Sequence, residues 1–540
     1  MVAAALKGAL LYAGVVPFNA DEAVVALMAR HILQGERPVF FYGQAYLGSL
    51  DAWLVAGAFA LLGQSVLVVR VLQAALYLGT ILTTYLLGLE IYSSRWIAGT
   101  AALLLAVPTV VVTLYTTASL GGYGETLLIG NILFLLALRL DPDPMAELRD
   151  GVGRVGVSVG WLSFGLLGGL GFWGFPLIAV YLLPALIYLV VRKAPGGNWL
   201  RRSAGWALAA LGFGTGAAPW LWFTSTHGLV TLAETGGSAI AGASAAQPVF
   251  AAFQHVFNFL LLGLTVIFGL RPPWSAQLLA LPLVPLALTL DVALLAFMLG
   301  IAAPARDAAR GGRWLLLGSC VTLVAAFILT PFGADPSGRY FLPLAAPLAL
   351  FTAEILHALR ARQRRVQSPL GAWFVNALAL SGVAFNAWGT VQSAVAFPPG
   401  LTTQFDPVAQ VDQRYLPELI TFLRGQGETR GYGNYWVEFP LAFRSSEDLI
   451  YEARLPYHLD FRYTPRDDRY LPYAETVRAS ARAAYITTRH PPLDGRLRAG
   501  LARLGVSFRE TQIGDFHVFY ALSRKVVPEE LGLGVECYPP

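Results

Sequence analysis

Long uninterrupted apolar runs dominate the N-terminal part of the chain. The longest, from Gly156 to Val191, contains 36 residues and no charged side chain. A helix rises about 1.5 Å per residue, so it needs roughly 20 apolar residues to cross about 30 Å of hydrocarbon. This run therefore predicts two membrane-spanning helices that turn near Gly171–Pro176. By the same criterion, further spans are predicted at residues 3–17, 67–91, 96–116, 124–140, 204–224, 276–303, 314–331, 341–359 and 370–393.

A different pattern begins near residue 396, where shorter elements of both types alternate. Two segments have helical periodicity and three are strand-like: Val408–Arg424 and Arg496–Leu504, and Asp448–Glu452, Ala484–Thr488 and Phe516–Leu522. We expect a small α/β domain over residues 396–540. It would follow an all-α polytopic membrane domain of about 11 transmembrane helices over residues 1–395.

Charged residues separate the same two regions. Residues 1–395 hold 36 charged side chains, and the remaining 145 residues hold 35. The whole chain is 56% hydrophobic and 13% charged, with a mean hydropathy of +0.57, whereas soluble domains are about a quarter charged. The bilayer must therefore solvate much of the first region, and the predicted boundary lies near Pro398–Pro399.

Several functional classes are disfavoured by the charge distribution and by the absence of their motifs. The net charge of +5 arises in short loops between apolar runs, where it reports insertion orientation and not nucleic-acid binding. The cysteines, Cys320 and Cys537, form no CxxC pair. The sequence contains no HExxH, P-loop, GxSxG or EF-hand pattern, which disfavours soluble hydrolase and nucleotide-driven mechanisms. Only three of the 38 basic residues are lysine, as is typical of a prokaryote with a GC-rich genome.

The sidedness of the chain depends on residues 250–270. This stretch is apolar enough to span, but it carries Gln254, His255 and Asn258. If it lies along the interface, eleven spans place fourteen basic residues in inner loops and four in outer loops, which satisfies the positive-inside rule. If it spans, seven of the fourteen change sides. We therefore predict that residues 396–540 lie outside the cytoplasmic membrane; the sequence leaves open whether further residues precede Met1.

The first outer loop, about residues 18–65, begins with two adjacent acids. Asn19 precedes Asp21 and Glu22, and an amphipathic helix is predicted through Val24 and beyond, up to Gly35. One interpretation is structural: Asn19 caps the helix, and the acids complement its macrodipole. The functional alternative is that carboxylates emerging from a membrane span accept a proton or hold a cation beside a lipid-borne substrate.

Later in this loop, residues 40–51 combine aromatic, hydroxyl and amide side chains, among them Tyr42, Gln44 and Asp51. Aromatic residues at a bilayer surface can simply anchor the interface. However, aromatic faces also stack on sugar rings, and Gln44 and Asp51 suit hydrogen bonds to hydroxyl groups. The mixture is compatible with a carbohydrate site.

Two other outer segments carry candidate polar groups. The loop around residues 333–343 contains Arg339 and Tyr340, and arginine offers a planar fork of donors that suits phosphate, although ordinary head-group contact is an alternative. Glu125 begins a predicted span at the outer surface, where it can either face a cavity or cap the helix. For Asp291, inside the predicted span 276–303, the sequence leaves open whether it faces a cavity or pairs with a neighbour.

These segments resemble the GT-C superfamily of membrane glycosyltransferases, and most closely the family 39 group of protein mannosyltransferases and aminoarabinose transferases. Four short motifs, which together extend over most of residues 1–395, carry the resemblance: Asp21-Glu22-Ala23, Arg30 to Gly35, Gly63 to Arg70, and Gly338-Arg339-Tyr340. The family's Pro-containing segment of the first loop is here Gly48-Ser49-Leu50-Asp51, which weakens the transfer of a role to Asp51.

The resemblance implies a hexosyl- or pentosyltransferase that moves a sugar, with inversion, from a polyprenyl-phosphate donor to an acceptor outside the membrane. Asp21 would be the general base, with Glu22 beside it, and Arg339 with Tyr340 would contact the donor phosphate. Tyr42, Gln44, Asp51 and Glu125 are the candidate substrate-binding residues. Several members of the family work without a metal, so no metal is claimed here, and the use of a divalent cation stays open. The acceptor, whether glycan, lipid or protein, is not specified.

Two other functions remain open at this point. A lipid-linked-saccharide transporter or flippase would place charged or broken-helix features near the midplane in paired halves, whereas the distinctive polar residues here lie at one predicted surface. The second alternative is a non-catalytic envelope scaffold. The transferase hypothesis requires Asp21 and Arg339 to converge on one outward, lipid-accessible pocket.

Overall fold

The structure is a computed structural model. It describes residues 1–140, 154–191, 199–234, 248–301, 310–335, 337–365, 369–396 and 400–534. The predicted boundary at Pro398–Pro399 lies outside these residues, as does Cys537.

Two compact units divide the chain. The first, which we call the helical unit, comprises Met1–Ala13, Tyr46–Asp51 and Arg70–Ser393. The second, the mixed unit, comprises Gly14–Ala45, Ala52–Val69 and Ala394–Pro540. Much of the first loop is therefore grouped with the C-terminal segment. The division into domains of residues 1–395 and 396–540 stays a prediction from composition.

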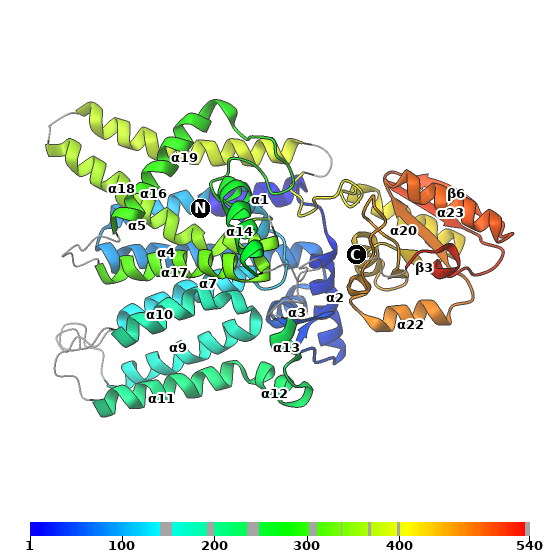
Figure 1. Ribbon diagram of the computed structural model, residues 1–540, viewed down its shortest axis with the longest axis horizontal. Helices are drawn as coiled ribbons and strands as arrows, with labels where there is room; N and C mark the ends of the chain where they lie inside the picture. The colour runs from blue at the N-terminus through cyan, green and yellow to red at the C-terminus, as the bar shows by residue number, and fades with distance from the viewer. Residues whose placement is uncertain are drawn as a thin grey trace. The chain divides into compact units, whose positions relative to one another are not determined.

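Most elements of the helical unit are helices that follow the apolar runs (Figure 1). They are α1 (Val2–Ala13), α4 (Val66–Tyr92), α5 (Arg95–Ala106), α6 (Val110–Tyr115), α7 (Tyr123–Arg139), α9 (Arg154–Gly174), η1 (Pro176–Ile178), α10 (Ala179–Val191), α11 (Trp199–Gly216), α12 (Ala218–His227), α13 (Val230–Ala233), α14 (Pro248–Asn258), η3 (Phe259–Gly263), α15 (Leu264–Ile267), η4 (Leu281–Leu283), α16 (Val284–Ile301), α17 (Arg310–Leu329), η5 (Pro331–Ala334), η6 (Arg339–Leu344), α18 (Ala345–Arg365) and α19 (Pro369–Val395).

Six of the described helices are long and apolar enough to cross a membrane, which fits a multi-pass membrane protein. They are Val66–Tyr92, Gly156–Gly174, Leu281–Met298, Gly311–Leu329, Arg339–Gln363 and Trp373–Val395. Five other apolar helices are shorter: Val2–Ala13, Leu50–Leu62, Arg95–Ala106, Pro176–Val191 and Ala251–Ile267. The predicted number of eleven spans therefore stays a prediction, and so does the placement of residues 250–270 along the interface.

Two of the predicted spans are interrupted. The predicted span 96–116 is divided into α5 and α6 around Pro108, and the predicted span 204–224 is divided into α11 and α12 just before Pro219. Proline lacks the amide hydrogen that continues a helix and disfavours helical backbone in the residue before it. An apolar run is therefore a poor guide to helix length where it contains proline.

Glycines bring α9 and α11 into close contact. A side chain at Gly165 or Gly169 would collide with the carbonyl groups of Ala209 or Phe213, and one at Gly212 would collide with Leu162. Small residues at helix interfaces allow such backbone approach in membrane proteins. The core of this unit includes the fully buried rings of Phe134, Phe164, Tyr181 and Phe351.

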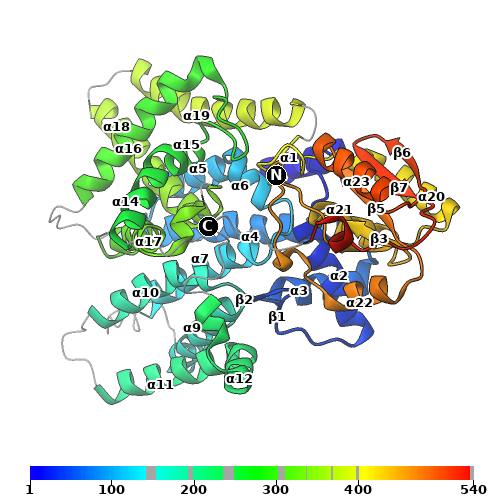
Figure 2. The same ribbon diagram turned by 45° about the vertical axis from the view of Figure 1, so that its right-hand side comes forward.

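The mixed unit contains a five-stranded sheet in its C-terminal segment (Figure 2). The strand order is β4-β3-β5-β7-β6, with β3 parallel to β4 and β5 and with β7 antiparallel to β5 and β6. The elements are η7 (Gln413–Tyr415), α20 (Leu416–Gln426), β3 (Arg430–Gly433), α21 (Tyr435–Arg444), β4 (Ile450–Ala453), η8 (Pro465–Asp467), α22 (Leu471–Ala479), β5 (Ala484–Thr488), α23 (Pro491–Arg503), β6 (Arg509–Ile513), β7 (Phe516–Tyr520) and η9 (Pro528–Leu531).

The first loop is more ordered than its sequence predicts. It forms α2 (Ala20–Gln34), a two-stranded sheet of β1 (Phe40–Phe41) and β2 (Gln44–Gly48), and α3 (Leu50–Leu62). Helix α2 was expected to be amphipathic, but every residue from Glu22 to Ile32 is buried. The reason is that α2 packs against α21 of the C-terminal segment, whose Phe443 ring lies 5.6 Å from that of Phe18.

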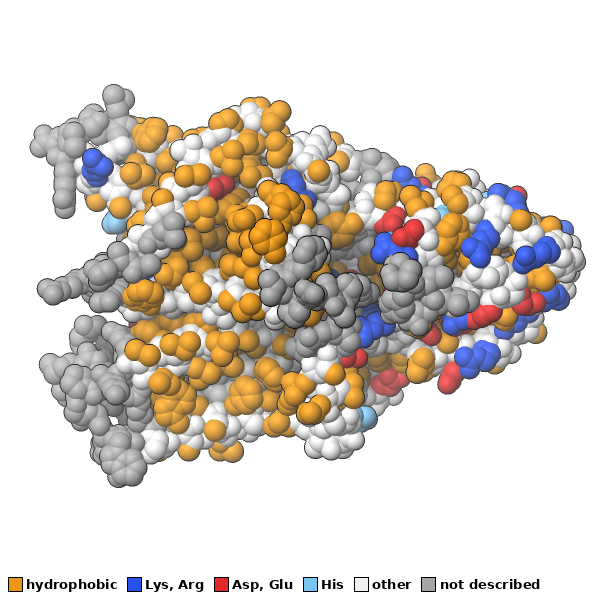
Figure 3. Space-filling view, in the orientation of Figure 1, with side chains coloured by type: hydrophobic (Ala, Val, Ile, Leu, Met, Phe, Trp, Pro, Cys, Tyr) orange, Lys and Arg blue, Asp and Glu red, His pale blue; other side chains and the backbone are white. Residues whose placement is uncertain are grey.

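The surfaces of the two units differ. Hydrophobic side chains cover much of the helical unit in the face shown in Figure 3, whereas acidic and basic side chains gather over the C-terminal segment. The segment Leu281–Met298, which includes most of α16, illustrates the first case, because only 6% of it is buried within the protein. Exposed apolar side chains over long helices are expected where lipid is the solvent.

Candidate active site

Helix α2 begins as its sequence predicts. The Oδ1 atom of Asn19 accepts a hydrogen bond from the backbone N–H of Glu22 at 2.9 Å, and Gly35 ends the helix in a left-handed conformation with φ of 113°. Asp21 and Glu22 occupy the first turn. Glu22 is completely buried, while Asp21 keeps part of its surface exposed. The cap therefore presents only Asp21, and not both acids, at an accessible position.

Asp21 contacts the C-terminal segment. The hydroxyl of Tyr435 donates a hydrogen bond to Asp21 Oδ1 at 2.5 Å, and the guanidinium of Arg469 lies 5.2 Å from the centre of the Tyr435 ring. Asp467 interacts electrostatically with both Arg469 and Asp21. Burial raises the pKa of Asp467 to about 7, Arg469 acts to lower it, and Asp21 acts to raise it further. Two carboxyl groups, a phenol and a guanidinium thus lie together in the mixed unit.

Tyr42 and Gln44 also have partners from this segment. With its amide oxygen toward Arg469, Gln44 accepts from two guanidinium nitrogens at 2.6 and 3.0 Å. The hydroxyl of Tyr42 donates to Glu36 at 2.6 Å, and its ring stacks on Tyr470 with centroids 4.7 Å apart. Both side chains therefore help to hold the first loop against the C-terminal segment, and their predicted contact with substrate stays a prediction.

The Arg30-His31 pair of the first loop meets one acid of the C-terminal segment. Glu447 lies 2.9 Å from His31 Nε2 and 3.3 Å from Arg30, and it accepts from the hydroxyl of Tyr473 at 2.8 Å. Burial acts to raise the pKa of Glu447, but hydrogen bonds from His31, Tyr473 and Arg30, together with the charge of His31, lower it to about 2. We call Arg30, His31, Glu447 and Tyr473 the anchor cluster, because they tie α2 to the C-terminal segment.

Asp51 and Glu125 come together in the helical unit. Asp51 is buried and accepts from Gln73 Nε2 at 2.9 Å and from Ser119 Oγ at 2.5 Å. Glu125, at the start of α7, is 4% exposed and interacts electrostatically with Asp51. No N–H or hydroxyl group of the described residues donates to its carboxylate oxygens, and its hydrogen-bonding neighbour is the carboxyl group of Asp51. The nearby Gly48 is required sterically, since a side chain there would collide with the carbonyl of Trp173.

Arg339 lies among aromatic residues of the same unit. It pairs with Asp335 at 2.5 Å, donates a hydrogen bond to the hydroxyl oxygen of Tyr340 at 3.3 Å and interacts electrostatically with Tyr123. Its side chain is 36% exposed, and its buried Nε has no partner in the described part of the chain. The guanidinium therefore retains capacity to donate to an anion. The phenols around it can donate to the same anion.

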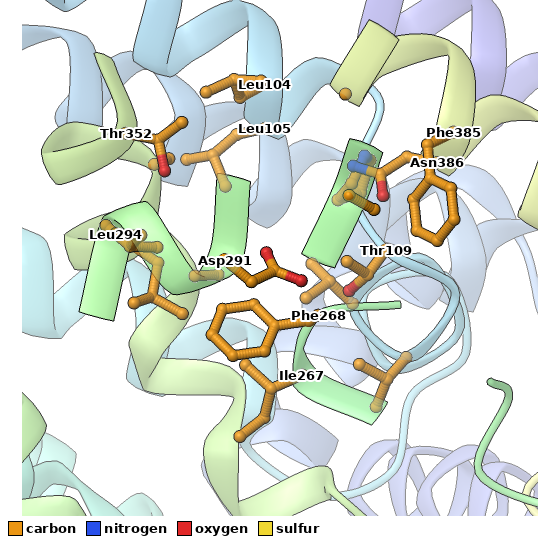
Figure 4. Close-up of a pocket in the computed structure, with 18 of the residues that line it drawn as sticks. Leu104, Leu105, Thr109, Ile267, Phe268, Asp291, Leu294, Thr352, Phe385 and Asn386 are labelled. Carbon is orange, nitrogen blue, oxygen red and sulfur yellow. The ribbon is translucent and has the colours of Figure 1, made fainter. Parts of the chain in front are cut away.

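An apolar cavity reaches the residue before Arg339 (Figure 4). Its lining includes Gly338 and Phe341 together with Asp291, whose Oδ2 atom has no partner among the described residues. Asp291 therefore faces a cavity, which answers the question that its sequence position left open. Most of the other lining residues are apolar, as in Leu105, Phe268 and Phe385.

The eight predicted site residues divide equally between the units. Asp21, Glu22, Tyr42 and Gln44 belong to the mixed unit, and Asp51, Glu125, Arg339 and Tyr340 to the helical unit. The convergence of Asp21 and Arg339 on one pocket stays a prediction. Over the described ranges, no three His, Cys, Asp or Glu side chains are grouped to hold a metal ion.

The residues that sequence reasoning missed are in the C-terminal segment: Tyr435, Glu447, Asp467 and Arg469. The only available signals were a Tyr435-Trp436 pair after a glycine-rich strand and the charged run from Arg466 to Arg469. Neither signal connects these residues to Asp21, more than 400 positions earlier.

Comparison with known proteins bears on the fold. No family model and no curated protein sequence matches the chain. Among solved structures, ArnT from Cupriavidus metallidurans bound to undecaprenyl phosphate aligns with a TM-score of 0.57 and 15% identity, over 92% of this chain and 93% of that one. The apo state of the same protein aligns with a TM-score of 0.56 and 14% identity, over 92% of each chain.

The fold of this chain is similar to that of ArnT. The similarity covers nearly the full length of both chains, so it includes the helical region and the C-terminal segment. The resemblance to GT-C proteins expected from the short motifs is thereby confirmed at the level of fold. The archaeal oligosaccharyltransferase AglB from Archaeoglobus fulgidus also aligns, with a TM-score of 0.47 and 15% identity, over 94% of this chain and 70% of that one.

Proposed function

We propose that the chain is an integral membrane glycosyltransferase that transfers a sugar from a polyprenyl-phosphate donor to an acceptor outside the cytoplasmic membrane of a prokaryote. The observation that carries this proposal is the ArnT-like fold over 92% of the chain. One of the ArnT structures contains undecaprenyl phosphate, a ligand of the proposed donor class. A donor of this kind arrives through the bilayer, so the enzyme needs no nucleotide-binding domain.

The proposed chemistry uses a carboxylate that accepts a proton and a guanidinium that stabilises negative charge. Asp21, with Glu22 beside it, removes the proton from the acceptor hydroxyl as that oxygen attacks the anomeric carbon. Attack from the face opposite the phosphate inverts the configuration. Arg339 and Tyr340 stabilise the charge that develops on the departing phosphate.

The remaining candidate residues would contact the substrates. Asp51 and Glu125 can accept hydrogen bonds from sugar hydroxyls, and the lack of an N–H or hydroxyl donor to Glu125 among the described residues favours such a role. Tyr42 and Gln44 are the other two candidate substrate-binding residues.

The proposal can be tested in membranes that contain the full-length chain. They would be incubated with polyprenyl-phosphate donors that carry a labelled hexose, pentose or amino sugar, and label in non-donor products would be measured. We expect transfer from at least one donor and a loss of about 10³-fold in Asp21→Asn, since base catalysis contributes about 10² to 10⁴-fold.

Asp460→Asn is the matched control, because Asp460 is an exposed acid of the C-terminal segment that forms a surface ion pair with Arg462. It should retain the wild-type rate. Transfer unaffected by Asp21→Asn would contradict the catalytic assignment. Movement of the donor across the membrane without transfer would instead identify a flippase.

A further inference from the structure

The best-defined contact of Asp21 is made by a residue from the far end of the chain. Tyr435 is 3% exposed, and its hydroxyl donates to Asp21 Oδ1 at 2.5 Å. Among the described residues, this is the one hydrogen bond that the Asp21 carboxylate receives. The other oxygen, Oδ2, is therefore available to a ligand.

The position of Tyr435 is determined by the sheet of the C-terminal segment. It is the first residue of α21, directly after β3, and the helix is capped by Asn434, whose Oδ1 accepts from the N–H of Trp436 at 3.0 Å. The amide of Asn434 in turn donates to Thr488 on β5 at 2.9 Å. The cap thus links the helix start to a neighbouring strand, so the phenol has a rigid support.

The surroundings of the Tyr435 ring keep its hydroxyl protonated. Burial raises the pKa of Tyr435 well above its ordinary value, the charge of Asp21 raises it further, and Arg469 opposes these effects. Arg469 lies over the ring at 5.2 Å, and the ring of Phe439 lies 5.4 Å away on the next turn. Tyr435 can therefore serve as a permanent donor to the carboxylate.

We propose that Tyr435 is a positioning residue for Asp21, so that the C-terminal segment completes the catalytic base of the transferase. This inference rests on the proposed function. A carboxylate that receives one donor at Oδ1 is held in a single orientation, and Oδ2 can then accept the proton of the acceptor hydroxyl. Without the donor, the side-chain torsion of aspartate is broad and the oxygen loses its alignment.

The test compares two buried tyrosines that each donate one hydrogen bond. Tyr435→Phe keeps the ring beneath Arg469 and removes only the hydroxyl. Tyr451→Phe removes a hydroxyl of similar burial, which donates to the carbonyl of Glu428 at 2.8 Å and has no contact with Asp21. Initial rates would be measured with the donor that supports transfer in the membrane assay above.

For Tyr435→Phe we expect kcat to fall by about 10-fold to 100-fold with donor and acceptor KM values within about 2-fold of wild type. Tyr451→Phe should change neither parameter. The double variant Asp21→Asn with Tyr435→Phe should be no slower than Asp21→Asn alone, because the two side chains act as one unit.

An unchanged kcat in Tyr435→Phe would overturn the role of Tyr435, as would an equal loss in Tyr451→Phe or an additive loss in the double variant. These outcomes leave the proposed function intact, since the wild type transfers in each of them. If the wild type transfers from none of the donors, the proposed function fails, and the inference about Tyr435 fails with it.

Discussion

Two glutamates, the partly buried Glu447 of the mixed unit and the buried Glu125 of the helical unit, differ in their hydrogen-bond partners. In the mixed unit, Glu447 receives hydrogen bonds from His31, Arg30 and Tyr473. In the helical unit, no N–H or hydroxyl group of the described residues donates to Glu125, whose neighbour is another acid, Asp51. A buried polar group without a partner costs about 1 to 3 kcal/mol, so it persists where something other than stability maintains it.

This difference separates residues whose hydrogen bonds are made within the protein from residues that have capacity to bind a ligand. The anchor cluster is complete without any substrate, so its motif in the first loop is explained by packing alone. Glu125, and Nε of Arg339, have capacity that the described residues do not use. From this comparison we propose a structural role for Glu447 and a binding role for Glu125 and Arg339, and variants in each unit can test the proposal.

The largest effect is expected for Glu447→Ala. Removal of this carboxylate leaves the nearly buried Arg30 without its ion pair, which costs about 3 kcal/mol because the charge remains in a poorly solvated place. Thermal or denaturant unfolding of the full-length protein in detergent would measure the loss. A change below about 1 kcal/mol would show that the anchor cluster does not hold the first loop.

A smaller effect, on activity and not on stability, is expected for Arg339→Gln. Loss of a charged donor to phosphate should reduce kcat/KM for the donor by about 10²-fold, since such hydrogen bonds contribute about 1.5 to 3 kcal/mol. The unfolding temperature should barely change, because the side chain is 36% exposed. The control is Arg462→Gln, at an exposed surface ion pair, and it should affect neither quantity.

Within the helical unit, replacement of Asp51 and of Glu125 by the corresponding amides should have different effects on stability. Asp51→Asn places an amide N–H against the donors of Gln73 or Ser119, and we expect a loss of about 1 to 2 kcal/mol. Glu125→Gln replaces an acid that faces the carboxyl group of Asp51 by a neutral amide that can donate to it, so stability should be unchanged or slightly higher while transfer falls. Greater destabilisation by Glu125→Gln than by Asp51→Asn would reverse the comparison.

The smallest effect is the pH dependence of stability in the mixed unit. The folded pKa of Glu447 is about 2, below its ordinary value of 4.5, so its contribution is present above about pH 4.5 and is lost as pH falls toward 2. The folded pKa of Asp467 is about 7, above its ordinary value of 3.8, so its contribution is complete below about pH 4 and is lost as pH rises through 7.

Unfolding temperatures measured from pH 3 to 8 should therefore be highest near pH 4 to 4.5, where both contributions are present. Glu447→Gln should flatten the acid side of the curve, and Asp467→Asn should flatten the side near neutrality. If neither variant changes the shape of the curve, the assignment of these two groups is wrong.

Local patterns predicted the elements whose signals lie within a few residues. The Asn19 cap of α2, its end at Gly35 and the strand Ala484–Thr488 occur where they were expected. The strand β3 was missed because Arg430–Gly433 contains two glycines and no alternation. The edge strand β6 was missed because its residues are mostly exposed and polar.

The candidate site was predictable only in part, for a similar reason. Asp21 and Arg339 could be selected because acidic and basic residues next to apolar runs are conspicuous in sequence. Tyr435, Asp467 and Arg469 could not, because each lies in an ordinary soluble-type segment. Their relation to Asp21 arises only when α21 packs against α2.

The sequence by itself determined where the chain is apolar enough to enter a membrane and where its helices are capped, because hydropathy and capping depend on neighbouring residues. The tertiary structure alone decided which polar groups have partners. Glu22 is buried, Glu447 is satisfied and Glu125 is not, because hydrogen-bond partners come from segments up to several hundred residues away.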